Sequence, residues 1–380
     1  MSLIIDEHRT YLSDPVRLEA FRNAIDRVVK PGSIVLDLAS GTGILGLMAC
    51  RAGAARVYSI ESGGMVEVAR QVAQDNGVAD RITFIKQFST HAALPERVDV
   101  VIADQVGNFG FNAGVLQYFA DARARFLKPD GVTIPSRLDL VLSPVENPDL
   151  FEPIEFWATA PGGFDFDGVR TLAANTGYQV NFPSTGFLAP EECVASLDLN
   201  HASVQPIHGT VAFRSSRSGV LHGIGGWFVA ELAAGITMTN SPLTKERIQR
   251  RQVFFPVGQP VAVAEGDTIR VDMSIRPADL LVNWTVEVGD GTTEGLKGRF
   301  HHSTWKGMLL NQEDLARTRP DFVPRLNARG EARRTVVDLC DGVRTIRDIE
   351  AEVVRRHPEL FASNEEVATF VAEVTTRYAE

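Results

Sequence analysis

The feature that most constrains this chain is a glycine-rich turn between an apolar run and a helical pattern. The run Ile34-Val35-Leu36-Asp37-Leu38 is typical of a buried strand, and glycines at 41, 43 and 46 follow it. Glycine lets the backbone turn sharply and approach a ligand, and the start of the next helix offers unpaired N–H groups. A strand, a glycine turn and a helix in this order predict a ligand site at the turn.

Short apolar runs and helical stretches alternate around this turn. We expect strands at 33–38, 56–61, 82–85 and 98–103, and helices at 44–51 and 66–76. Such alternation is typical of a parallel sheet covered on both faces. Residues 1–137 are therefore predicted to form an α/β, Rossmann-like domain that binds a cofactor.

The helical period is lost after about residue 138. Short alternating runs, separated by Gly, Pro and Asp, occur at 138–142, 211–213, 226–232, 251–255, 268–275 and 283–288. This pattern predicts an antiparallel β-barrel or sandwich over residues 138–312, with a more irregular excursion at 161–190.

The last part of the chain, residues 313–380, returns to a helical pattern. Thr345 is expected to cap a helix, with Asp348 at the capping-box position, and a last amphipathic helix is expected from Asn364. We predict a small helical, winged-helix-like module.

Two acidic residues beside the glycine turn indicate its ligand. The glycine spacing also fits the Gly-x-Gly-x-x-Gly pattern of dinucleotide sites, so a nicotinamide enzyme is an alternative, as is a turn needed only for packing. Glu61 ends the second expected strand, where a carboxylate can accept both hydroxyls of a ribose. Asp37 would repel a phosphate and suits an amine. A ribose, a sulfonium and an ammonium without phosphate describe S-adenosylmethionine.

A series of further motifs surrounds the turn. They include Asp14-Pro15-Val16-Arg17, Phe21-Arg22-Asn23, residues 35–46, Ser59-Ile60-Glu61, Leu127-Lys128-Pro129-Asp130-Gly131, Thr239-Asn240-Ser241-Pro242 and Arg251-Gln252-Val253-Phe254-Phe255. In these motifs, over about residues 8–290, the chain resembles the protein arginine methyltransferases.

The resemblance implies a set of cofactor contacts and an oligomer. Together with Asp37, the expected contacts are Arg17 on the cofactor carboxylate with His8 nearby, Gly41 and Gly43 under the cofactor, Glu61 on the ribose, and Ser89 and Thr90 beside the adenine. Within the excursion, residues 163–190 would form an arm that reaches the cofactor domain of a second subunit. A homodimer is therefore expected.

The acceptor side departs from the family. Arginine chemistry needs two glutamates on one loop after the fourth strand, because a guanidinium is planar, always charged and best held by paired carboxylates. Asp104 stands at the first position and Ala113 at the second. Where the family has Thr-His-Trp on another loop, this chain has Arg247-Ile248-Gln249. The substrate-binding candidates of this more neutral pocket are Gln105, Asn108, Asn112, Arg247 and Gln249.

These departures favour a methyltransferase whose acceptor is a nitrogen or oxygen other than that of arginine. Asp104 is the expected catalytic residue, which would orient the acceptor or take its proton. The amide side chains suit a neutral acceptor, although asparagines in such a loop are alternatively plain turn formers. Arg247 and Arg250 would instead suit a carboxylate acceptor. A small-molecule O- or N-methyltransferase, a true protein arginine methyltransferase and a non-catalytic cofactor-binding scaffold remain alternatives.

A second resemblance concerns the C-terminal module. Residues 321–327 and the run Leu339-Cys340-Asp341-Gly342-Val343-Arg344-Thr345 are similar to the helical part of PqqD-type peptide-recognition domains. That resemblance implies a ribosomally made peptide or protein as substrate, bound as an added strand beside a helix. The alternative is a helical cap that packs on the barrel or assembles subunits.

Composition limits the partners and the compartment. Acidic residues outnumber basic ones 48 to 38, which argues against nucleic acid because phosphate contacts need Lys and Arg. Three cysteines lie far apart and no spacing fits a metal site, so neither disulfides nor a metal is expected. Without a signal-peptide pattern or an apolar run of the ~20 residues that span a bilayer, we expect a cytoplasmic protein that does not bind membranes.

Overall fold

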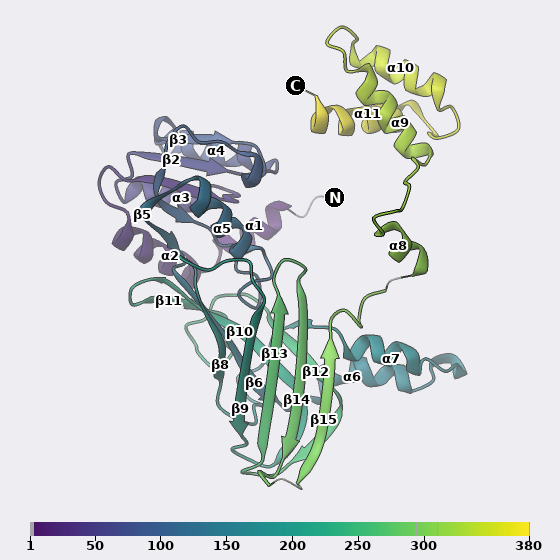
Figure 1. Cartoon of the computed structure of the whole chain (residues 1–380). Coiled ribbons are helices and arrows are strands. Elements are labelled where there is room, and N and C mark those ends of the chain that lie inside the picture. Colours follow the sequence, from purple (N-terminus) through teal and green to yellow (C-terminus); the bar gives the residue numbers. More distant parts are fainter. Residues whose placement is uncertain (1–3, 293–294, 310, 380) are drawn as a thin grey trace. The chain divides into compact units, whose positions relative to one another are not determined.

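The computed structural model describes residues 4–292, 295–309 and 311–379 (Figure 1). The chain divides between Met308 and Leu309 into two compact units. The expected cofactor and β-barrel domains are therefore parts of one unit, and the helical module begins slightly before the expected residue 313. Within the described residues, no helix combines the length and the apolar character that a bilayer crossing requires.

The first part of the larger unit is a five-stranded parallel sheet of order β3-β2-β1-β4-β5. Its strands are β1 (Ile34–Leu38), β2 (Arg56–Ile60), β3 (Ile82–Ile85), β4 (Val98–Ile102) and β5 (Leu127–Ile134). The helices of this part are α1 (Ile4–Leu12), α2 (Pro15–Val28), α3 (Ile44–Arg51), α4 (Met65–Asp75) and α5 (Val115–Arg125). The Rossmann-like α/β prediction is confirmed.

The register of this sheet brings three loops to one edge. Asp37 of β1 pairs with Ser59 of β2 and with Ile102 of β4. Because the strands are parallel, the turns that follow β1, β2 and β4 leave the sheet side by side. The side chains of Leu36 and Val101 are fully buried, so the strands that carry these turns are anchored in the core.

The second part of the larger unit consists of two antiparallel sheets. One has the order β7-β12-β10-β6-β8, with β11 paired to β10, and the other has the order β15-β14-β13-β9. The strands are β6 (Arg137–Val145), β7 (Tyr178–Val180), β8 (Glu192–Asp198), β9 (Ile207–Arg214), β10 (Gly219–Ala233), β11 (Ile236–Thr239), β12 (Gln252–Val263), β13 (Thr268–Arg276), β14 (Leu281–Gly289) and β15 (Leu296–Ser303).

These two sheets form the expected antiparallel barrel. Strand β8 lies beside β9 and β12 lies beside β15, so the sheets meet along both edges. One continuous hydrophobic cluster extends from the barrel into the parallel sheet and includes both Phe228 and Ile102. This shared core explains why two expected domains fold as one unit.

The expected irregular excursion is a mainly helical projection that begins before residue 161. It contains α6 (Pro148–Glu155), the 3₁₀ turns Phe156–Ala158 and Pro161–Gly163, and α7 (Asp167–Ala174), and it returns through β7. Figure 1 shows α6 and α7 standing out at the side of the barrel. A separate small core that includes Phe151, Ile154 and Phe182 holds the projection together.

The smaller unit is helical. Its helices are α8 (Gln312–Arg317), α9 (Ala328–Leu339), α10 (Ile346–Arg356) and α11 (Asn364–Tyr378). The capping box of Thr345 and Asp348 is present, and α11 begins at the expected residue. A core of its own, which includes Val336, Val353 and Phe370, packs the last three helices together.

The winged-helix-like expectation for this unit needs correction. Residues 309 and 311–379 contain no strand, so this described part holds neither wing strands nor a sheet edge that could accept a peptide strand. The helices satisfy their backbone groups internally, and asparagine, threonine and serine side chains cap their starts. The resemblance to PqqD-type domains is limited to the helical pattern.

Candidate active site

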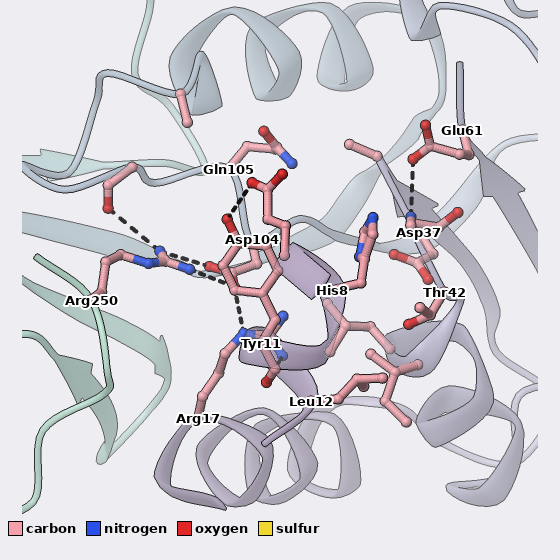
Figure 2. Close-up of a pocket in the computed structure, with 18 of the residues that line it drawn as sticks. His8, Tyr11, Leu12, Arg17, Asp37, Thr42, Glu61, Asp104, Gln105 and Arg250 are labelled. Atoms are coloured by element: carbon pink, nitrogen blue, oxygen red, sulfur yellow. Dashed lines mark hydrogen bonds and ion pairs between the residues drawn. The ribbon is translucent and has the colours of Figure 1, made fainter. Parts of the chain in front are cut away.

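A cavity of about 640 Å³ opens where the glycine turn meets the loops of the barrel. It is lined by α1, the turns after β1 and β2, the loop after β4, and the residues just before β12 (Figure 2). Of the residues predicted from sequence, those at the cavity are His8, Arg17, Asp37, Gly41, Glu61, Asp104, Gln105, Asn108 and Gln249. The parallel sheet thus meets the barrel at one concave site.

The backbone of this turn requires glycine at two positions. Gly41 has φ of +53°, and a Cβ atom there would lie 2.3 Å from Cε1 of His8. Gly43 has φ of +74° and precedes the first residue of α3. Residues that carry a side chain rarely adopt such backbone angles, so glycine is needed at both positions. His8 therefore lies closely against the turn, and its expected place near the cofactor stays a prediction.

Glu61 is held at the cavity by backbone groups. Its Oε2 accepts a hydrogen bond from the Gly41 N–H at 3.0 Å, and its Oε1 accepts one from the Gly63 N–H at 2.7 Å. A carboxylate has about four lone-pair positions, so two remain for further donors. The geometry fits recognition of two ribose hydroxyls.

Asp37 lies at the floor of the same cavity and is fully buried. Its Oδ2 accepts a hydrogen bond from the Gly46 N–H at 2.9 Å, whereas Oδ1 has no partner among the described residues. Burial raises the pKa of Asp37 to about 7, against the opposing effects of the Gly46 N–H and Arg17. An unpartnered buried acceptor suits a ligand that brings an N–H donor, such as the ammonium group of S-adenosylmethionine.

The two residues expected beside the adenine are not among those that line the cavity. Ser89 and Thr90 lie in a 3₁₀ turn, Ser89–His91, after β3. The Ser89 hydroxyl is buried and has no partner among the described residues, while Thr90 is exposed. Their adenine contact stays a prediction, and the unpartnered hydroxyl is compatible with it.

The acceptor end of the cavity is organised around Asp104 (Figure 2). Its Oδ2 accepts hydrogen bonds from Arg17 Nε at 2.6 Å and from Arg250 Nη2 at 3.0 Å. Its Oδ1 accepts one from Arg250 Nη1 at 3.2 Å. All three side chains are nearly buried, with exposed fractions of 7% for Arg17, 9% for Asp104 and 10% for Arg250.

This arrangement changes the expected role of Asp104. Burial opposes its charged form, but the charges and hydrogen bonds of Arg250 and Arg17 outweigh that effect and lower the pKa of Asp104. A carboxylate with a lowered pKa and both oxygens bonded is a poor proton acceptor. Asp104 positions two arginines in this structure, whereas the sequence indicated a group that handles the acceptor. Arg17 was expected on the cofactor carboxylate, and here its Nε faces Asp104.

The predicted residues of the loop after β4 have two different positions: some line the cavity and one faces the backbone of the loop. Gln105 and Asn108 line the cavity, as expected. Asn112 is not among the lining residues, because its Oδ1 accepts hydrogen bonds from the backbone N–H groups of Asn108 and Phe109. It shapes the turn, which is the alternative that sequence reasoning left open. A substrate contact by Asn112 is therefore unsupported.

The second acceptor loop places Gln249, Arg250 and Arg251 at the cavity, and Arg247 outside the lining residues. Sequence reasoning considered Arg250 only as a partner for a carboxylate acceptor, and its pairing with Asp104 was missed. Asp14 was also missed as an organiser. It caps α2 by accepting a hydrogen bond from the Arg17 N–H, and it accepts another from the Gln249 N–H at 2.6 Å. The Asp14-Pro15 pair was a visible helix-start signal.

Three further residues of α1, Glu7, Tyr11 and Leu12, line the cavity without having been predicted. The Tyr11 hydroxyl donates to Glu7 Oε1 at 3.1 Å, and the Tyr11 ring lies within 5.8 Å of the Arg250 guanidinium carbon. Burial is the largest cause that raises the pKa of Tyr11, so the phenol stays protonated. The spacing of four residues between Glu7 and Tyr11, which places both on one helix face, was the available signal.

Comparisons with known families divide the chain as the structure does. Residues 22–138 match the family described as ribosomal protein L11 methyltransferase, and residues 137–285 match the arginine methyltransferase oligomerization subdomain. An arginine N(omega)-methyltransferase of Streptomyces achromogenes subsp. streptozoticus is 31% identical over 270 residues, which cover 69% of this chain and 74% of that protein. Protein arginine N-methyltransferase 6 of Xenopus laevis is 27% identical over 319 residues, 78% and 92% of the two chains.

Solved structures share the fold at low identity. A chain of the Trypanosoma brucei PRMT1 enzyme-prozyme heterotetrameric complex with AdoHcy superposes with a TM-score of 0.70 and 20% identity, over 78% of this chain and 96% of that one. Arabidopsis thaliana protein arginine methyltransferase 10 gives a TM-score of 0.67 and 22% identity, over 78% and 97%. In both cases the match is one of fold.

The ionisation of Asp37 predicts how cofactor affinity depends on pH. The carboxyl of the free protein is protonated below about pH 7, and only its charged form attracts an ammonium group. We expect affinity for S-adenosylhomocysteine to rise between about pH 5.5 and about pH 7.5, by up to roughly tenfold per pH unit, and then to level off. Isothermal titration calorimetry measures this profile.

Asp37→Asn is expected to flatten that profile, and Asp75→Asn, at an exposed helix end, is the matched control that should keep it. A wild-type affinity that stays constant across this range would contradict the role of Asp37.

Proposed function

The chain belongs to the arginine methyltransferase family of S-adenosylmethionine-dependent enzymes, and we propose that it methylates a neutral nitrogen or oxygen, other than that of arginine, on a ribosomally made peptide or protein. One observation carries the choice of acceptor. Both oxygens of Asp104 are bonded by arginines of the chain itself. Ala113 stands where a second carboxylate would be needed, so a guanidinium of the substrate finds no free carboxylate on this loop.

The chain's own residues have defined tasks in such a reaction. S-adenosylmethionine, when bound, supplies an electrophilic methyl group on its sulfonium. Glu61 would hold the ribose, Asp37 would hold the ammonium group, and Arg17 would hold the carboxylate of the cofactor with nitrogens other than the Nε that bonds Asp104. The amides of Gln105, Asn108 and Gln249 line the remaining space. Amides both donate and accept hydrogen bonds, so they can orient a neutral acceptor against the methyl carbon.

Methylation of a neutral acceptor releases a proton, and Glu7 is the carboxylate best placed to receive it. Among the carboxylates that line the cavity, Asp104 is bonded to two arginines, and Glu61 and Asp37 are bonded to the glycine turn. The described contacts of the Glu7 carboxylate are a single hydrogen bond from the Tyr11 hydroxyl. A partly solvated carboxylate of this kind can pass the proton to water.

Arginine methylation is the second candidate. It is favoured by the names of the relatives, among them the arginine N(omega)-methyltransferase that is 31% identical to this chain. For that reaction Arg250 would have to leave Asp104, and the missing second carboxylate would have to come from elsewhere, for example from Glu7.

We assign recruitment of the peptide to the smaller unit. This unit has its own core, and nothing in the chemistry of a methyl-transfer core requires it. Because its described residues form helices, we propose that a peptide segment packs between helices and is not added as a strand. A shallow concave site between α9 and α11, lined by Arg329, Phe370 and Glu373, is one candidate. The alternative, a structural cap, remains open to test.

The projection formed by α6 and α7 supports a homodimer. It carries aromatic side chains that are exposed in the single chain: Phe156, Phe164 and Phe166. A surface groove on the cofactor side, lined by residues that include Ile5, Leu12 and Met65, offers an apolar counterpart for the arm of a second subunit. Exposed aromatic groups on one part of the chain and an apolar groove on another favour burial in an interface between two copies.

The acceptor is identified by locating the transferred methyl group. The full chain is incubated with labelled S-adenosylmethionine and a peptide library that contains Arg, Lys, Asn, Gln, His and Ser, and labelled positions are read by tandem mass spectrometry. We expect label on neutral side chains, and none after Glu61→Gln, because the ribose loses its charged acceptor. Label confined to arginine Nω atoms would contradict the proposal.

Removal of the smaller unit tests peptide recruitment. A chain that ends at Met308 keeps the cavity and the larger core, so its affinity for S-adenosylhomocysteine should stay unchanged. With the peptide that the full chain methylates, KM should rise about tenfold or more while kcat at saturation changes little, because binding but not chemistry is lost. An unchanged KM would show that the unit serves another purpose.

The dimer is tested with a charge on the arm. Phe164→Glu is expected to convert dimers to monomers in size-exclusion chromatography with light scattering, because a buried unpaired carboxylate disfavours the interface. Val343→Glu, at a position that is 86% exposed in the smaller unit, is the matched control and should leave the mass unchanged. A wild-type monomer at micromolar concentration would contradict the proposal.

A further inference from the structure

We propose that Arg250 is an internal occupant of a guanidinium subsite, and that this residue excludes arginine side chains from a pocket that would otherwise bind them. The inference deepens the proposed function, because it names the residue that selects the acceptor class. It predicts a binding site that becomes measurable once Arg250 is removed.

The contacts of Arg250 are those that a bound guanidinium would make. Its two terminal nitrogens bond the two oxygens of Asp104, a bidentate pairing in which the fork of the guanidinium matches the carboxylate (Figure 2). Nη1 also donates to the Gly107 carbonyl at 3.4 Å. The guanidinium carbon lies 5.8 Å from the centre of the Tyr11 ring. A carboxylate, a carbonyl and an aromatic ring therefore surround it.

The backbone that carries Arg250 is held at three consecutive residues. The Gln249 N–H donates to Asp14 at 2.6 Å, the Arg250 carbonyl accepts from Gln252 Nε2 at 3.0 Å, and the Arg251 carbonyl accepts from Asn240 Nδ2 at 2.8 Å. Asp14, Gln252 and Asn240 are themselves buried. Such support keeps the side chain aimed at Asp104 and argues against a surface arginine that folds inward by chance.

Charge explains why the occupant excludes a second guanidinium. Arg17 and Arg250 share the carboxylate of Asp104, so these three side chains together carry one net positive charge, and Asp14 is the next carboxylate whose charge acts on Arg250. Another guanidinium brought into this end would meet two like charges and an Asp104 whose two oxygens are already bonded, at distances where a low dielectric strengthens repulsion. Discrimination by an unfavourable contact is a common way to reject a competing ligand.

Removal of the Arg250 side chain should reverse this balance. Asp104 would keep the hydrogen bond from Arg17 Nε to Oδ2, while the positions facing Oδ1 and the Gly107 carbonyl would become free. The remaining pair is neutral, so a guanidinium from outside would restore the original charge and the original contacts. The vacated side-chain volume provides the space.

The test is direct binding of a blocked arginine to the full chain with S-adenosylhomocysteine present. The probe is N-acetyl-arginine methylamide, and the neutral comparison ligand is N-acetyl-citrulline methylamide, which has nearly the same shape without the charge. Isothermal titration calorimetry compares the wild type with Arg250→Ala. We expect the variant to bind the arginine probe about tenfold more tightly or better, as expected for a charge-assisted hydrogen bond, with no gain for citrulline.

Three further variants support the interpretation. Arg250→Met keeps the volume of the side-chain stem and should show the same gain, which guards against collapse of the pocket in the alanine variant. Adding Asp104→Asn to Arg250→Ala should abolish the gain. Lys245→Ala removes one positive charge from an exposed position on the same loop and should leave probe binding as in the wild type.

The outcomes separate this inference from the proposed function. Failure of the wild type to bind S-adenosylhomocysteine would sink the methyltransferase assignment. Normal binding of S-adenosylhomocysteine, together with no gain for the arginine probe in both Arg250→Ala and Arg250→Met, would overturn the occupant role. An equal gain for the citrulline probe would also overturn it, because the gain would then reflect space and not charge.

Discussion

The active site depends on one shared carboxylate. Asp104, on the loop after β4, is bonded by Arg17 from α2 and by Arg250 from the loop before β12. These three segments lie far apart in the sequence and belong to the parallel sheet, the N-terminal helices and the barrel. Each of the three side chains is nearly buried, so a charge on any one of them without its partner would cost a large loss of solvation. The ion cluster therefore makes the position of each segment conditional on the other two.

Such a cluster is poor evidence for added stability, because desolvation of three charges offsets much of the attraction between them. The cluster instead fixes one arrangement of the three segments, and the hydrogen bonds around it support the same arrangement. Asp14 and Asn240 use buried side chains to fix backbone groups next to Arg250, and Asn112 does the same for the loop that carries Asp104. These side chains position the charged groups, and the neutral amides of Gln105 and Asn108 line the cavity beside them.

The sequence predicted well whatever depends on local pattern. The glycine turn, the strand that leads to Glu61 and the capping box at Thr345 follow from spacing over a few residues, and the structure contains each of them, with the strand ending one residue earlier than expected, at Ile60. The pairing of Asp104 with Arg250 spans 146 residues, and no local pattern encodes it. The roles of Asn112 and Arg247 could not be assigned either, because a polar residue on a loop can face the cavity or the backbone. Residues 311–379 contain helices and no wing strands, which shows the limit of a resemblance carried by helices alone.

The net charge of −10 suggests a cationic partner, yet the acceptor end of the cavity is locally positive. Global charge acts over distances comparable to the Debye length and guides approach, whereas selection takes place within a few ångströms of buried groups. Ala113 removes an attraction for guanidinium and Arg250 adds a repulsion, so two changes on separate loops act in the same direction. Ala113 alone or Arg250 alone would weaken the binding of a substrate arginine. A pocket that binds arginine, as in the family, would have no use for either residue. Their coincidence around Asp104 is the strongest argument for the non-arginine acceptor that we propose in a chain that keeps the fold of its family.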